Sequence, residues 1–137
     1  MVGILIIAHG TLGESLIQCA SHVMGGRPPL LLQLGVSMHD DPARVVQQAE
    51  AMVHQLDQDD GVLVLTDVYG ATPSNIAARL LVPGHVEGLA GVSLPMLVRA
   101  LTYRNEPLRT VLAKAMSGGV EGVFRMPPAI ANAATGS

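Results

Sequence analysis

The chain has 137 residues, of which 49% are apolar and 14% charged, and this composition predicts one folded domain with its own core. A net charge of −3, with two tyrosines, one phenylalanine and no tryptophan, argues against nucleic-acid binding through a basic face or stacked rings. The single cysteine excludes an internal disulfide and a cysteine-rich zinc site. No apolar run approaches the ~20 residues of a membrane span, and no charged segment precedes the first run as in a signal peptide. We therefore expect a cytoplasmic protein without direct membrane insertion.

The first half of the chain alternates apolar runs with helical patterns. Residues 2–8 are continuously apolar and rich in β-branched side chains, which predicts a strand buried on both faces. Residues 12–24 have helical spacing, with a predicted inward stripe of Leu12, Leu16, Cys19, Ala20 and Val23. Asp40-Asp41-Pro42 predicts the start of a helix that runs to about residue 56. Two further strands are predicted, at residues 30–34 and 61–66.

The second half continues this alternation with shorter elements. Thr72 is predicted to cap a helix that has Pro73 in its first turn and ends near residue 81. A weaker strand over residues 86–92 precedes a helix that is capped by Ser93 and reaches about residue 103. The last helix is expected to begin at Glu106-Pro107 and to end at Gly118-Gly119, with residues 120–124 as a final strand.

This order of elements predicts an α/β fold, a mainly parallel open sheet with helices on both faces. We expect one domain over residues 1–125 and a flexible Pro/Ala-rich tail over residues 126–137. In open parallel sheets, ligands bind in the crevice outside the carboxyl ends of the strands. Polar residues that directly follow a strand are therefore the first candidates for a functional site.

His9 and Asp67 follow the first and third predicted strands. An imidazole at the start of a helix can attack a phosphoryl group, and the free backbone N–H groups of the helix attract the phosphoryl oxygens. A carboxylate that binds one ring nitrogen fixes the tautomer, leaves the other nitrogen free to attack and stabilises the charged ring. Each residue alone is more often a cap or a turn residue. The two together favour a phosphoryl-transfer site.

Groups near these two residues are candidates for binding the phosphoryl oxygens. They are the backbone at Gly10, Thr11, Gly70 and Ala71 and the hydroxyl group of Thr72. The Walker A pattern is absent, so nothing in the sequence supports binding of ATP or GTP.

The other histidines and the cysteine are interpreted as structural. His22 and His54 lie inside predicted helices, and Cys19 is expected to be buried rather than reactive. His39 stands beside Asp40 and Asp41, but adjacent residues rarely converge on one ion, so we interpret this group as helix capping. No metal and no other cofactor is expected.

Three separate motifs stand in the order and spacing of a known family. They are Ile7-Ala8-His9-Gly10, the run LTDVYGATPSN over residues 65–75, and the run AGVSLPMLV over residues 90–98. Over about residues 1–124 the chain resembles enzyme IIA of the mannose family of the bacterial phosphotransferase system. It departs from the family's pattern by one glycine fewer in the loop after Asp67 and by Ser93, where asparagine is frequent. Neither departure changes His9 or Asp67.

The resemblance implies both a fold and a reaction. The fold is a mainly parallel sheet whose last strand is antiparallel and exchanged in a homodimer, and residues 120–124 match that strand in position. In the implied reaction, the phosphocarrier protein HPr gives its phosphoryl group to His9, and the group then passes to a histidine of a IIB domain. Asp67 matches the family carboxylate that orients the ring, and Thr72 stands where the family usually has serine. We expect no IIB domain after residue 125, and both sugar uptake and a stand-alone regulatory sensor stay open.

Two other classes of protein remain as alternatives. A small tetrapyrrole metal chelatase also places a His-Gly pair after its first strand, and His85 is its only candidate for a second metal-facing residue. That alternative leaves Asp67 unexplained. A regulatory binding protein without turnover would retain the fold, but the presence of both His9 and Asp67 argues against a complete loss of phosphorylation.

Overall fold

The computed structural model describes residues 1–130 and confirms the α/β fold. Its strands are β1 (Gly3–His9), β2 (Leu31–Val36), β3 (Val62–Thr66) and β4 (Val86–Ala90). Its helices are α1 (Leu12–Met24), α2 (Pro42–Leu56), α3 (Thr72–Ala78), α4 (Leu94–Tyr103) and α5 (Leu108–Glu121). Within residues 1–130, no helix is long and apolar enough to cross a membrane.

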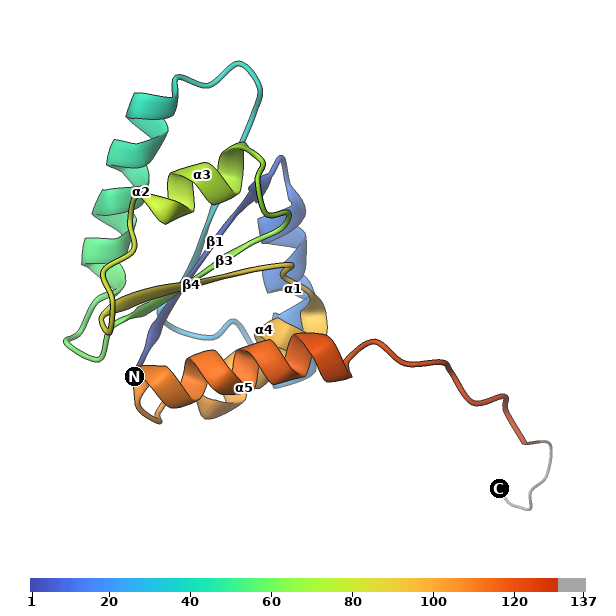
Figure 1. Ribbon diagram of the computed structural model, residues 1–137. Helices are drawn as coiled ribbons and strands as arrows, with labels where there is room; N and C mark the ends of the chain where they lie inside the picture. The colour runs from blue at the N-terminus through green and yellow to red at the C-terminus, as the bar shows by residue number, and fades with distance from the viewer. Residues whose placement is uncertain (131–137) are drawn as a thin grey trace.

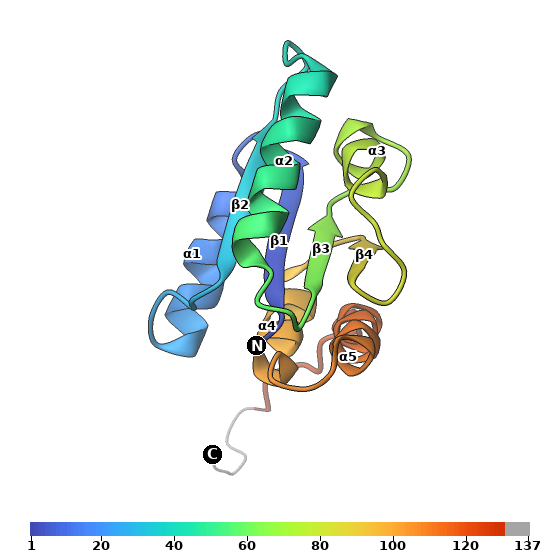
Figure 2. The same cartoon turned by 90° about the vertical axis from the view of Figure 1, so that its left-hand side faces the viewer.

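The four strands form one parallel sheet in the order β2-β1-β3-β4. Helices α1, α4 and α5 cover one face of the sheet, and α2 and α3 cover the other (Figures 1 and 2). The central strands β1 and β3 are apolar along almost their whole length because successive side chains enter two different cores, whereas the outer strands β2 and β4 each contain a polar residue, Gln33 and Glu87. In β1, for example, Ile4 and Ile6 belong to one core, whereas Leu5 and Ile7 belong to the other. The central strands β1 and β3 are neighbours, so their carboxyl ends lie side by side.

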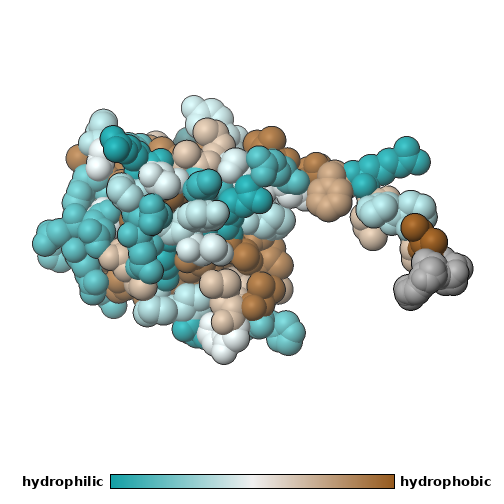
Figure 3. Space-filling view, turned by 90° about the horizontal axis from the view of Figure 1, so that it is seen from below, coloured by the Kyte–Doolittle hydropathy of each residue, from teal (hydrophilic) through white to brown (hydrophobic). Residues whose placement is uncertain are grey.

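The predicted strand over residues 120–124 is wrong. Helix α5 continues past the expected stop to Glu121, and residues 123–130 form neither strand nor helix. This segment extends away from the rest of the molecule (Figure 3). The side chains of Val123 and Phe124 are largely exposed. The sheet formed by the described residues is therefore entirely parallel. Part of the predicted tail, residues 131–137, lies outside the described residues.

Glycines near the end of α5 do not stop the helix because they form its contact with α4. A Cβ atom added to Gly118 would lie 2.8 Å from Cβ of Arg99, so any larger residue would separate the two helices. Gly119 stands similarly close to the side chain of Met96. The pair of glycines thus allows close helix packing, which local sequence cannot distinguish from a helix stop.

The inward stripe predicted for helix α1 is confirmed at Ala20, which is buried, and at Leu16, which packs against the core, but not at its other positions. Its buried residues are Gly13, Ile17 and Ala20, whereas Cys19 and Val23 are exposed. Glycine is required at position 13 because the helix lies close to β2 there: a Cβ atom on Gly13 would be 3.0 Å from the Gln33 side chain. The expectation that Cys19 is buried is therefore wrong.

Candidate functional site

His9 and Asp67 meet at the carboxyl edge of the sheet. The register pairs Ile7 of β1 with Thr66 of β3, so the next residues of both strands emerge at the same edge. The Oδ2 atom of Asp67 accepts the backbone N–H of His9 at 2.9 Å and lies 2.7 Å from Nδ1 of the His9 ring. The carboxylate thus fixes both the ring of His9, which the sequence placed at the same edge as Asp67, and the His9 backbone, which the sequence did not predict.

The Asp67 carboxylate is held in its charged form. Partial burial raises its pKa, because only 10% of the side chain is exposed. Hydrogen bonds from the backbone and ring of His9, and from the N–H of Val68 to Oδ1 at 2.8 Å, outweigh that effect. The pKa of Asp67 is therefore below its ordinary value. A charged carboxylate at Nδ1 favours the tautomer that has its proton on this nitrogen.

The other nitrogen of the His9 ring is open to an incoming group. The side chain is 56% exposed, and Nε2 has no hydrogen-bond partner among residues 1–130. With Nδ1–H donated to Asp67, Nε2 carries a lone pair that points away from the carboxylate. The arrangement is that of an oriented, accessible nucleophile.

A tight turn after His9 begins helix α1. Gly10 has a φ of +55°, in the left-handed region, and donates its N–H to the carbonyl oxygen of Val36 at 3.0 Å. The Gly10 N–H is thus engaged, so the phosphate-binding role expected of this amide is not available in this structure. The N–H of Thr11, in contrast, has no backbone or side-chain partner within residues 1–130.

The loop after Asp67 differs in detail from its prediction. Thr72 is the first residue of α3 rather than its cap, and Ala71 occupies the cap position. Thr72 is exposed and makes no hydrogen bond to His9 or Asp67. The N–H of Gly70 donates to Oγ of Ser74 at 2.8 Å, so this amide is not free either. The N–H of Ala71 has no partner among the described residues.

Sequence reasoning missed two residues that shape this edge. Ser74 is 8% exposed and bonds the loop through its hydroxyl group. Gly35 of β2 packs against the turn after His9, because a Cβ atom there would lie 2.3 Å from the carbonyl oxygen of Gly10. A serine in the first turn of a helix and a glycine inside a strand were the only local signals.

The chelatase alternative receives no support from the geometry. His85 precedes β4 at the opposite edge of the sheet, where its carbonyl oxygen accepts the N–H of Val62 at 2.9 Å. The length of β1 separates that edge from His9, ~20 Å at the usual rise of a strand. The His85 ring instead pairs with Asp57, at 2.5 Å between Nε2 and Oδ2.

Within residues 1–130, no group of three or more histidine, cysteine, aspartate or glutamate side chains is placed to hold a metal ion. Asp41 caps α2 by accepting the N–H of Ala43 at 3.2 Å, and Asp40 accepts the N–H of Ser37 at 2.7 Å. The interpretation as helix capping is confirmed for Asp41, whereas Asp40 bonds within the turn that precedes α2.

Fold and site together define an α/β protein that presents one carboxylate-oriented histidine at the carboxyl edge of a parallel sheet. The chain belongs to the family described as the PTS system fructose IIA component, whose family model (EIIA-man) matches residues 3–116. Members of this family are components of the sugar phosphotransferase system, as the resemblance in the sequence implied.

Curated relatives carry the same assignment. The PTS system mannose-specific EIIAB component of Escherichia coli K12 is 31% identical over 125 residues, which cover 89% of this chain. The corresponding protein of Shigella flexneri matches to the same extent. The aligned part is 38% of these relatives, so the chain spans well under half of their length.

Solved structures agree on the fold. The phosphotransferase component EIIA from Streptococcus agalactiae has a TM-score of 0.80 at 23% identity, covering 91% of this chain and 97% of that one. The mannose/sorbose-specific IIA subunit from Enterococcus faecalis has a TM-score of 0.81 at 18% identity, covering 94% and 97%.

Proposed function

We propose that Nε2 of His9 accepts a phosphoryl group from the phosphohistidine of HPr and passes it to a histidine of a IIB partner. The observation that carries the proposal is the 2.7 Å contact between Nδ1 and Asp67, which leaves an accessible ring nitrogen opposite the carboxylate. Membership of the IIA family supports the same chemistry.

The transfer itself needs no metal and no cofactor. The lone pair of Nε2 attacks phosphorus as the bond between phosphorus and the donor imidazole breaks, and the donor nitrogen leaves with that electron pair as a neutral ring. The His9 ring keeps its Nδ1 proton and becomes positively charged. The Asp67 carboxylate, whose pKa is below its ordinary value, lies against that charge and stabilises it. The same contact assists the second transfer, from His9 to the IIB partner, because it holds the phosphorylated ring in one orientation for the acceptor.

Three groups near His9 are assigned to the phosphoryl oxygens. They are the N–H of Thr11, the N–H of Ala71 and the hydroxyl group of Thr72, none of which has another partner within residues 1–130. Gly10 and Gly70 contribute their positive φ angles to the turns on either side, and their own N–H groups are used within the protein.

The partners follow from the chemistry and the family. A donor must present an activated phosphoryl group on an imidazole, which HPr does, and the curated relatives are named EIIAB components, which favours a IIB acceptor. The same phosphorylation can serve sugar uptake or a regulatory signal. We also propose a homodimer in the cytoplasm, in which the extended segment after α5 contacts the second copy.

Phosphorylation in a reconstituted system tests the proposal. The protein is incubated with phosphoenolpyruvate, enzyme I and HPr, and an adduct that is labile in acid and stable in base is expected on His9. The variant His9→Ala should lose the adduct, whereas His22→Ala, which removes an exposed histidine from α1, should retain it. Absence of the adduct from the wild-type protein, or its presence in His9→Ala, would overturn the proposal.

A further inference from the structure

The loop between Asp67 and α3 has few contacts of its own. Val68, Tyr69 and Gly70 are exposed, and Gly70 has a φ of +89°. At its first residue, the loop is fixed because the Asp67 carboxylate accepts the backbone N–H groups of His9 and Val68 and contacts Nδ1 of the His9 ring. Its second half must be fixed by something else, because exposed loops with a glycine in the left-handed region otherwise sample several conformations.

A single buried hydroxyl group fixes that second half. Oγ of Ser74 accepts the N–H of Gly70 at 2.8 Å and donates to the carbonyl oxygen of Ala71 at 3.0 Å. The side chain is nine-tenths buried, at 8% exposure for the residue, so water competes weakly for these bonds. Both roles of the hydroxyl, acceptor and donor, are used within the loop.

These two bonds orient peptide groups beyond the atoms they touch. In a trans peptide, the N–H and the C=O point in opposite directions. Because the carbonyl of Ala71 points toward Ser74, the N–H of Thr72 points away from it. Because the N–H of Gly70 points toward Ser74, the carbonyl of Tyr69 points away. The Ser74 hydroxyl group therefore determines the direction in which the N–H of Thr72 and the carbonyl group of Tyr69 point.

We propose that Ser74 is a positioning residue for phosphoryl transfer at His9, acting through the conformation of residues 68–72. This inference rests on the proposed function and extends it to a residue that touches neither His9 nor the phosphoryl group. Its role is preorganisation: polar groups fixed before the reaction stabilise the transferring charge without the cost of ordering the loop during the transfer.

The chain contains a matched control for this serine. Oγ of Ser117 in α5 also makes one accepted and one donated bond, from Nη1 of Arg99 at 3.3 Å and to the carbonyl oxygen of Lys114 at 3.1 Å. It lies in the α4–α5 contact, away from the loop between β3 and α3. Ser117→Ala therefore removes comparable hydrogen bonds without disturbing residues 68–72.

A conservative variant separates the hydroxyl group from the rest of the side chain. Ser74→Thr retains the hydroxyl and adds one methyl group. Ser74 borders a pocket of about 100 Å³, lined also by Tyr69, Ala77 and Leu89, which offers room for that methyl group. Ser74→Thr is expected to restore transfer that Ser74→Ala loses.

Single-turnover transfer from phosphorylated HPr is measured for the wild-type protein and for Ser74→Ala, Ser74→Thr and Ser117→Ala, with thermal unfolding of each. We expect the maximal transfer rate of Ser74→Ala to fall by about tenfold or more, with little change in the HPr concentration at half-maximal rate. Ser117→Ala should transfer at the wild-type rate, and the thermal unfolding of each variant separates a loss of stability from a loss of transfer.

Three results would overturn the role of Ser74 while leaving the proposed function intact. The first is an equal transfer rate in Ser74→Ala and Ser117→Ala. The second is a folded Ser74→Thr that transfers as slowly as Ser74→Ala. The third is a Ser74→Ala variant with the wild-type maximal rate and only a higher HPr concentration at half-maximal rate. A wild-type protein that accepts no phosphoryl group would instead overturn the proposed function, and with it the ground for this inference.

Discussion

At the scale of single residues, the charge of Asp67 determines what His9 can do. An asparagine at this position can donate its amide N–H to Nδ1, which moves the ring proton to Nε2 and blocks the attacking lone pair. We expect Asp67→Asn to lower the single-turnover rate of transfer from HPr on the order of 10²-fold, a size typical for the loss of one preorganised electrostatic contact. Nitrogen NMR of the His9 ring should show the altered tautomer. An Asp67→Asn protein with the wild-type rate would remove the orienting role assigned to this carboxylate.

Gly35 acts on His9 from the neighbouring strand. A Cβ atom at this position would stand 2.3 Å from the backbone oxygen of Gly10, and a backbone atom cannot move aside as the end of a flexible side chain can. We expect Gly35→Ala to displace the turn after His9 and to reduce phosphoryl transfer by about tenfold or more. The fold should persist, because Gly35 is exposed near the end of a strand.

The matched control for Gly35 is Gly26. A Cβ atom on Gly26 would meet nothing within 4 Å, so Gly26→Ala should leave both transfer and stability close to those of the wild type. Both variants are compared by transfer rate and by circular dichroism. Normal transfer in Gly35→Ala would show that the turn tolerates displacement and that the contact does not position His9.

At the scale of elements, the sequence does not distinguish a glycine that ends a helix from one that allows close packing inside a helix. Gly25, which ends α1, and Gly118, which lies inside α5, look alike in sequence, but Gly25 has a φ of +83° whereas Gly118 is helical. The difference comes from α4, which packs against Gly118 and compensates for the low helix propensity of glycine. Contacts of this kind join residues about 20 positions apart and have no local signature.

A substitution pair tests the packing role of these glycines. Gly118→Ala places a Cβ atom 2.8 Å from Cβ of Arg99, next to the backbone of α4, so the helices must separate. Gly119→Ala places one 2.9 Å from Cε of Met96, the flexible end of a side chain that can rotate away. We expect Gly118→Ala to destabilise by about 1–3 kcal/mol, and Gly119→Ala by less, in urea unfolding. Equal stabilities would contradict the close packing of α4 on α5.

At the scale of the whole molecule, the buried strands and the edge at which they end were the most predictable features. Continuous apolar runs such as residues 2–8 mark the interior strands of a parallel sheet, and the rule on carboxyl ends then brings His9 and Asp67 to one edge. The hydrogen bonds of Ser74 and the approach of Gly35 to Gly10 depend on backbone paths that only the assembled fold defines. The orientation of α1 is of the same kind, since Gly13 and Ile17 face the sheet while Leu12, Cys19 and Val23 of the predicted stripe are exposed.

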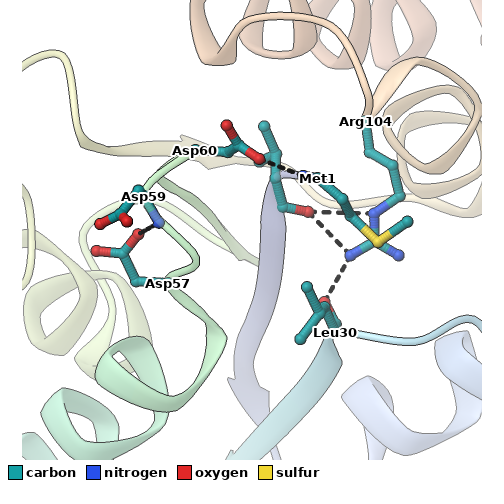
Figure 4. Close-up of polar contacts among 7 residues, drawn as sticks. Met1, Leu30, Asp57, Asp59, Asp60 and Arg104 are labelled. Carbon is teal, nitrogen blue, oxygen red and sulfur yellow. Dashed lines mark hydrogen bonds and ion pairs between the residues drawn. The ribbon is translucent and has the colours of Figure 1, made fainter.

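The edge opposite the candidate site is held together by a buried arginine. Arg104, at the end of α4, is 4% exposed and donates to the carbonyl oxygens of Val2, Pro29 and Leu30, at the starts of β1 and β2. Figure 4 shows its guanidinium group beside Leu30. Burial lowers the pKa of Arg104 to about 10, which means that the folded protein holds this charge at some cost. The cost is offset by four hydrogen bonds that tie one helix to two strands.

Replacement of this arginine tests how far the two edges of the sheet are independent. Arg104→Met should leave the buried carbonyl oxygens without their donor and destabilise the protein by about 1–3 kcal/mol, with relief from charge burial limiting the loss. Arg27→Met is the control, because Arg27 is half exposed and lies 3.4 Å from Glu14, a surface pair expected to contribute less than about 1 kcal/mol. Urea unfolding measures both variants. At temperatures where Arg104→Met is folded, it should accept a phosphoryl group on His9 at the wild-type rate, because the length of the sheet separates the two residues. A slow but fully folded Arg104→Met would show that the opposite edge controls the His9 site.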